Sequence, residues 1–128
     1  VTKPKVTQKR VKATKSISEK LLKLITTTLS DEKAEEIVQI DLRGRTEIAD
    51  YMIICSGRST RQVSALSEKI IDLTKTEFKI ISKTEGKSQG DWVLIDSGDV
   101  ITHIFRPEVR DFYQLEKLWS QNEILVDG

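Results

Sequence analysis

The sequence predicts a single α/β domain with a mixed sheet of about five strands and flanking helices. Its 128 residues are a length typical of one domain. Amphipathic helical patterns alternate along the chain with short apolar segments typical of strands. The last two strands are close enough to form a hairpin, so the sheet must contain an antiparallel pair. Two or three layers of helix and sheet satisfy this pattern.

Two helices are predicted from capping boxes followed by apolar spacing. Ser16 and Glu19 form the first box, ahead of leucines and isoleucines three and four residues apart. This pattern predicts a helix over about residues 17–29. Ser59 and Gln62 form the second box, and the following helix places on one side Val63, Leu66, Ile70 and Leu73.

The strands are predicted from short apolar runs. "EEIVQIDL" (residues 35–42) reads as a strand, and the unbroken apolar run "YMIICS" (51–56) predicts a strand covered on both faces. "EFKIIS" (77–82) is predicted as a third strand, followed by a polar loop over residues 83–90. The hairpin over residues 91–105 supplies the remaining two strands.

Pro107 suits the first turn of a third helix. Its apolar side is predicted to contain Val109, Phe112, Leu115 and Trp119. The domain is placed at residues 16–120, between a basic arm (1–15) and a C-terminal tail (121–128).

Composition favours a soluble, cytoplasmic protein. The chain is 38% hydrophobic and 32% charged, and no apolar run approaches the roughly 20 residues of a membrane span. Cys55 is the single cysteine, which excludes an internal disulfide and any zinc-binding spacing. Because it lies in an apolar run, Cys55 is predicted to be a buried and inert thiol. These features suit a reducing compartment.

Charge is unevenly distributed along the chain. The first fifteen residues carry six basic groups and no acidic group, whereas the rest carries 15 basic and 20 acidic groups, a net charge of −5. The arm has too few apolar residues to bury itself and is predicted to be disordered. A solvated leader, an RNA-contacting arm and an organelle transit remnant all remain open for it. The acidic body favours a basic protein partner.

The hairpin "DWVLIDSGDVITHIF" carries the most informative face of the sequence. If Ser97 and Gly98 form a two-residue turn, Trp92 lies opposite His103. Strand alternation then gives one compact apolar face. The other face is too apolar for open water and too polar for a sealed core, and it contains Trp92, Leu94, Asp96, Asp99, Ile101, His103 and Phe105.

Three interpretations of this face are open. A catalytic or metal site is disfavoured, because the single histidine is accompanied by none of the common nucleophile, zinc or phosphate-binding motifs. In a purely structural alternative, a loop or helix covers Trp92 and His103, and neither residue contacts a partner. Partner binding is favoured, because tryptophan among apolar residues with an acidic rim is typical of an interface hot spot. We therefore predict no catalytic residue, metal ligand, cofactor, small-molecule substrate or membrane contact.

Three stretches together resemble the ribosomal silencing factor family, also called the Iojap family. They are "DLRGRTEIADYMIICSGRSTRQV", the dipeptide "EG", and "DWVLIDSGDVITHIFRPEVRDFYQLEKLW". The resemblance covers residues 21–119 and implies a fold related to nucleotidyltransferases. It also implies binding to the large ribosomal subunit through its protein fourteen, which sterically blocks the small subunit and represses translation under nutrient limitation. Organelle relatives act in large-subunit assembly, and related bacterial members form dimers, so a homodimer is possible here.

The resemblance points to Trp92 as the apolar residue of the docking site. The predicted partner-binding residues are Glu85, Asp91, Trp92, Leu94, Asp96, Asp99 and His103. The nucleotidyltransferase kinship keeps one enzymatic alternative open, in which Asp41, Asp96 and Asp99 hold a divalent metal. The turn in "CSGRSTRQV" lacks the paired acids of such enzymes, so it is interpreted as a helix entry rather than a phosphate site.

Overall fold

The computed structural model describes residues 8–125. In chain order the elements are α1 (Gln8–Asp31), β1 (Glu35–Asp41), β2 (Tyr51–Ser56), α2 (Thr60–Phe78), β3 (Lys83–Glu85), β4 (Trp92–Asp96), β5 (Val100–Phe105), α3 (Pro107–Tyr113), the 3₁₀ helix η1 (Leu115–Asn122) and β6 (Glu123–Leu125). Within these residues, no helix combines the length and the apolar composition that crossing a membrane requires.

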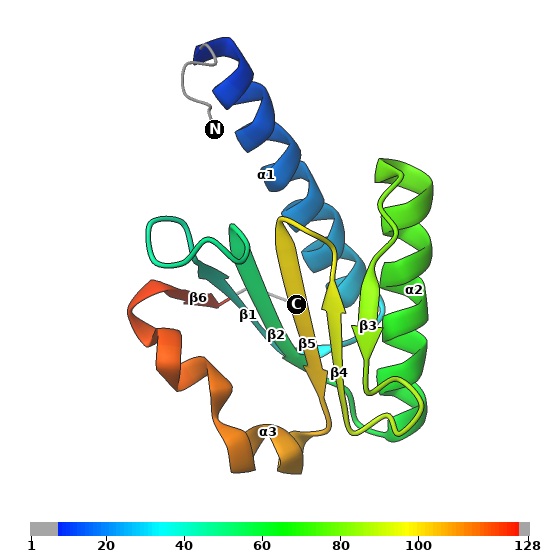
Figure 1. Ribbon diagram of the computed structural model, residues 1–128. Helices are drawn as coiled ribbons and strands as arrows, with labels where there is room; N and C mark the ends of the chain where they lie inside the picture. The colour runs from blue at the N-terminus through cyan, green and yellow to red at the C-terminus, as the bar shows by residue number, and fades with distance from the viewer. Residues whose placement is uncertain (1–7, 126–128) are drawn as a thin grey trace.

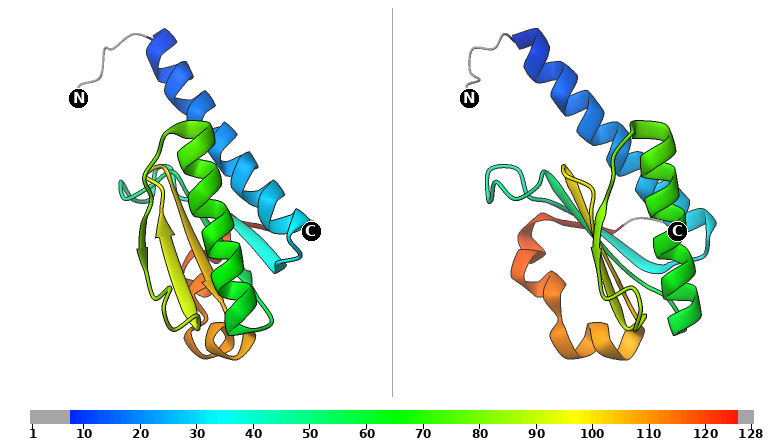
Figure 2. Two further views of the ribbon diagram at one scale, coloured as in Figure 1. Left: turned by 90° about the vertical axis from the view of Figure 1, so that its right-hand side faces the viewer. Right: turned by 45° about the vertical axis from the view of Figure 1, so that its right-hand side comes forward.

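The elements form three layers around one mixed sheet. The strand order is β3-β4-β5-β2-β1-β6, with β2 parallel to β5 and the other pairs antiparallel. Helices α1 and α2 cover one face, and α3 with η1 covers part of the other (Figures 1 and 2). The predicted α/β class and mixed sheet are confirmed. The described sheet has six strands rather than about five, because two three-residue edge strands join it.

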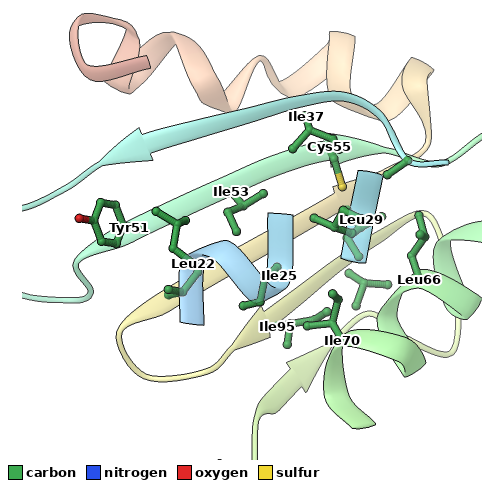
Figure 3. Close-up of a cluster of buried hydrophobic side chains, with 14 of the residues drawn as sticks. Leu22, Ile25, Leu29, Ile37, Tyr51, Ile53, Cys55, Leu66, Ile70 and Ile95 are labelled. Atoms are coloured by element: carbon green, nitrogen blue, oxygen red, sulfur yellow. The ribbon is translucent and has the colours of Figure 1, made fainter. Parts of the chain in front are cut away.

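The helix-covered face of the sheet contains the larger apolar core. Figure 3 shows Ile25 and Leu29 of α1 packed toward Ile53 of β2 and Ile70 of α2. Cys55 lies in the same cluster and is fully buried, and this burial raises the pKa of its thiol to about 12. The prediction of a buried, inert thiol is confirmed. Every residue of β2 is buried, as expected for a strand covered on both faces.

Helix α1 is longer than predicted. It begins at Gln8 rather than near residue 17, so residues 8–15 are helical and the prediction of disorder is wrong for them. Ser16 lies inside the helix and does not cap it. Lysine, arginine, glutamine and alanine all favour helix, and a sequence too polar to be buried can still continue a helix that is anchored further along. The rest of the predicted arm, residues 1–7, lies outside the described residues.

The third predicted strand, residues 77–82, is wrong. Helix α2 continues to Phe78, and Lys79 ends it in the left-handed conformation with φ of 60°. Phe78 and Ile80 pack against the core without joining the sheet, which accounts for the apolar run. The edge strand β3 instead begins at Lys83, inside the segment predicted as a polar loop.

The C-terminal part also differs from the prediction. Pro107 begins α3 as expected, but the helix ends at Tyr113, where Gln114 adopts a left-handed conformation with φ of 47°. The chain continues as η1 and then as β6, which pairs with β1. Residues 123–125, predicted to lie in a tail, are therefore part of the sheet.

The cap of α2 permits a stability prediction. Ser59 is the N-cap, and its side chain accepts a hydrogen bond of 3.1 Å from the Gln62 backbone amide. Ser59→Ala is expected to lower the free energy of unfolding by about 1 kcal/mol, measured by urea denaturation. Ser88→Ala, in an exposed loop, is the matched control. Equal stabilities of the two variants would contradict the capping role.

Candidate protein-docking surface

The hairpin of β4 and β5 has a different register from the predicted one. Trp92 pairs with Phe105, not with His103, and Asp96 pairs with Ile101. The turn is centred on residues 98–99, and Gly98 supplies the positive φ, 91°, that a tight hairpin turn requires at its first central position. The turn has thus moved by one residue along the chain.

The two predicted faces nevertheless survive. Moving a hairpin turn by one residue changes each pairing by two, so every side chain within the two strands stays on its face, whereas Asp99 becomes a turn residue. Val93, Ile95, Val100 and Ile104 pack in the core beneath α1 and α2. The opposite face joins a second apolar cluster, which includes from the hairpin Trp92, Leu94, Ile101 and Phe105.

Trp92 lies half-buried at the edge of this second cluster. Its ring stacks on Phe105 with centroids 4.8 Å apart and contacts the Tyr113 ring at 4.9 Å. Its indole Nε1 donates a hydrogen bond of 3.0 Å to Nδ1 of His103. Packing and a hydrogen bond therefore hold the indole in one orientation while part of it remains accessible.

His103 supports the indole from beneath. The side chain is only 6% exposed, and this burial lowers its pKa to about 4, so the ring is neutral at pH 7. Because Nδ1 accepts the hydrogen bond from Trp92, the ring proton is assigned to Nε2. His103 stays predicted as a partner-binding residue; in the structure it is buried and accepts the hydrogen bond that orients Trp92.

Two of the predicted acidic residues lie near the start of β4: Glu85 is paired with Leu94, and Asp91 directly precedes Trp92. Glu85 of β3 is exposed and Leu94 of β4 is half-buried. Asp91 accepts a hydrogen bond of 2.8 Å from Arg106 Nε. Arg106 also pairs with Glu108, so this corner of the surface holds two carboxylates and one guanidinium. This part of the surface is therefore acidic, although Arg106 neutralises part of the negative charge.

The other two predicted acidic residues lie elsewhere. Asp96 is at the far end of β4, where it accepts a hydrogen bond from the Gly98 amide and pairs across the sheet with Lys83. Asp99 accepts a hydrogen bond of 3.0 Å from Ser18 of α1, the helix that covers the opposite face. The expectation that Asp99 shares the face of Trp92 is therefore wrong.

Tyr113 is a candidate that sequence reasoning missed. It is 54% exposed, and its ring contacts that of Trp92. The two residues are far apart in the sequence, and no local pattern indicates that α3 returns to the start of β4. We define the Trp92 surface as the set formed by Glu85, Asp91, Trp92, Leu94 and Tyr113.

The three aspartates of the enzymatic alternative do not form a metal site in the described part of the chain. Asp41 is held by Arg43 through two side-chain hydrogen bonds, of 3.0 and 2.8 Å, which lower the pKa of its carboxyl. Asp41, Asp96 and Asp99 do not come together, and no three His, Cys, Asp or Glu side chains in the described part of the chain could share a metal ion.

The glycine turn before α2 has a packing role. A Cβ atom on Gly57 would lie 2.9 Å from a methyl carbon of Val63, so glycine allows the helix to approach the strand. The Gly57 amide donates to the Phe105 carbonyl at 2.8 Å, which joins the turn to β5. These contacts agree with the interpretation of this turn as a helix entry.

A family model and the sequences of known proteins both relate this chain to ribosomal silencing factors. A family model described as "Ribosomal silencing factor during starvation" matches residues 14–127. The ribosomal silencing factor of Zymomonas mobilis is 54% identical over 102 residues, which are 80% of this chain and 77% of that protein. The mouse protein named "Mitochondrial assembly of ribosomal large subunit protein 1" is 35% identical over 101 residues, covering 76% of this chain and 44% of the mouse protein.

Solved structures agree with the sequence relatives. A crystal structure of a Chromobacterium violaceum protein superposes with a TM-score of 0.74 at 37% identity, covering 80% of this chain and 85% of that one. A Bacillus halodurans crystal structure gives a TM-score of 0.71 at 36% identity, covering 86% and 99% of the two chains. The family match, the close relatives and the shared fold together show that this chain belongs to the ribosomal silencing factor family.

Proposed function

We propose that this protein binds the large ribosomal subunit through its protein fourteen and thereby blocks joining of the small subunit. Membership of the silencing factor family supports a role at the ribosome. The observation that carries the proposal is the half-buried indole of Trp92, which Phe105 and His103 hold in one orientation. The bound protein would then exclude the small subunit sterically, and this would repress translation without any chemical step.

The physical properties of the Trp92 surface suit a cationic protein partner. An aromatic side chain held by Phe105 and His103 loses little conformational freedom on binding, so its burial is converted efficiently into affinity. Glu85 and Asp91 flank the apolar centre and complement basic residues on the partner. The net charge of −5 on residues 16–128 acts in the same direction, because it steers the body toward a basic surface.

A subunit-joining assay tests the steric part of the proposal. Purified large subunits are incubated with the protein, small subunits are added, and joining is followed by light scattering. We expect joining to decrease with protein concentration and to saturate at one bound copy per large subunit. Unchanged joining, with the protein demonstrably bound to large subunits, would contradict the blocking role.

A second candidate function is assembly of the large subunit. The 35% identity to a mouse protein named for that process favours it, and the same docking surface would serve. The two functions differ in timing. Cells lacking an assembly factor accumulate incomplete large-subunit particles during growth. Cells lacking a repressor keep a normal large subunit and fail to reduce subunit joining during starvation.

A second copy of the chain is a competing occupant of the Trp92 surface. Sedimentation equilibrium of the free protein distinguishes the two occupants. If two copies pair through this surface, the measured mass is twice that of the monomer. The Trp92→Ala variant should then have the mass of a monomer. Protein fourteen would then compete with self-association.

A further inference from the structure

Helix α1 extends well past the sheet at its N-terminal end. In all three views its first turns project from the body, with no strand beside them (Figures 1 and 2). Residues 8–16 of this helix contain no acidic residue and four basic ones, Lys9, Arg10, Lys12 and Lys15. The basic segment of the sequence is therefore presented as part of a protruding helix.

The basic positions of α1 continue along one helical face. Positions 9, 12, 16, 20, 23 and 27 follow one another at spacings of three and four residues, which places them on the same side of an α-helix. Lys20, Lys23 and Thr27 line a groove together with Glu77 and Phe78 of α2. Positions 9 and 12 extend that side beyond the groove. From position 9 to position 23 the helix rises about 21 Å.

The C-terminal end of α2 adds to this basic region. Lys75 and Lys79 line a second groove there, together with Asp72, Thr76 and Ile81, so two basic side chains face one acidic side chain. Lys20, Lys23, Lys75 and Lys79 are all exposed, and within the described residues none of them takes part in an ion pair. Since these ammonium groups form no ion pair within the described residues, each of them can contribute favourable electrostatic energy to the binding of an external polyanion.

We propose that this face of α1, with the C-terminal end of α2, binds the phosphate backbone of RNA. The inference rests on the proposed function, which brings the protein to an RNA-rich particle. It concerns a surface separate from the Trp92 surface, since α1 and α2 cover the opposite face of the sheet. The two surfaces together would hold the protein by a protein contact and an RNA contact.

The composition of the projecting helix favours RNA over a lipid surface. Between residues 8 and 16 the apolar residues are Val11 and Ala13, too few to form a face that inserts among lipid chains. Basic residues at a helix N-terminus also oppose the helix dipole and repel one another. Phosphates that neutralise them are expected to stabilise these first turns.

Fluorescence anisotropy with a fluorescein-labelled 20-nucleotide RNA hairpin tests the proposal. The double variant Lys20→Gln/Lys23→Gln removes two charges from the basic face. The matched control, Lys69→Gln/Lys87→Gln, removes exposed Lys69 and half-buried Lys87, which are paired with Glu32 and Glu68. We expect the first variant to bind RNA about tenfold more weakly than the control. Its slope of log Kd against log salt should fall by about 1.4 to 1.8, the contribution of two phosphate contacts.

Two further readouts separate this proposal from the docking proposal. RNA should increase the helical circular dichroism signal of the wild type, and Lys20→Gln/Lys23→Gln should still capture isolated protein fourteen. Equal RNA affinity and salt slope in the two variants would overturn the RNA site. So would tighter binding to phosphatidylglycerol–phosphatidylcholine vesicles than to the hairpin. Loss of RNA binding with retained capture supports it, whereas failure of wild-type capture would affect the docking proposal alone.

Discussion

Trp92→Ala is expected to weaken binding to the large ribosomal subunit about 30-fold or more. A tryptophan at the centre of an interface contributes about 2 kcal/mol or more, and each 1.4 kcal/mol corresponds to a factor of ten in Kd. The indole is held before binding by Phe105 and His103, so little of this contribution is lost to ordering. Co-sedimentation of the variant with purified large subunits over a concentration series measures the change.

Three controls make this result specific to the indole. Ile48→Ala removes an apolar side chain that is 73% exposed and lies outside the Trp92 surface, and it should bind like the wild type. Trp92→Phe keeps an aromatic ring but loses the donor to His103, so an intermediate affinity is expected. Urea denaturation confirms that each variant is folded. A folded Trp92→Ala variant with wild-type affinity would exclude the indole from the interface.

Lowering the pH from 7 to 5 is expected to remove about 2 kcal/mol from the free energy of unfolding. His103 has a pKa of about 4 when folded, below the 6.5 of an unperturbed histidine, because it is buried. The unfolded chain therefore binds a proton first as the pH falls. Stability is full above about 6.5 and is lost progressively toward 4. Protonation of Nδ1 would also remove the acceptor for Trp92.

The assignment of this pH effect to one residue can be tested, because His103 is the only histidine of the chain. His103→Gln has no group that titrates in this range at that position. Its stability should change little between pH 7 and pH 5, although it starts from a lower value. Urea denaturation at both pH values provides the comparison. An equal loss in the wild type and the variant would show that other groups cause the effect.

Sequence patterns that lie within a single helix or strand predicted that element correctly. The cap and apolar spacing of α2 and the buried run of β2 each lie within one element, and both elements form where expected. Strand β3 was missed because it depends on pairing with β4, which no pattern within residues 83–85 indicates. The extension of α1 was missed because a polar composition excludes burial of residues 8–15 but does not exclude a helix.

The candidate site was only partly predictable for a similar reason. Strand alternation placed Trp92 and Leu94 on one face, and a register error of two residues did not change that result. Contacts between distant segments required the structure. Ser18 of α1 binds Asp99, and Tyr113 of α3 contacts the indole, although neither relation follows from spacing in the sequence.

Calorimetric titration of isolated ribosomal protein fourteen into this protein tests the central claim most directly. We expect saturable binding at one copy per chain for the wild type and for Ile48→Ala, with strongly reduced affinity for Trp92→Ala. Binding should weaken as salt rises, because the Trp92 surface includes the acidic residues Glu85 and Asp91. No binding of protein fourteen to the wild type, or equal binding to folded Trp92→Ala, would contradict the account.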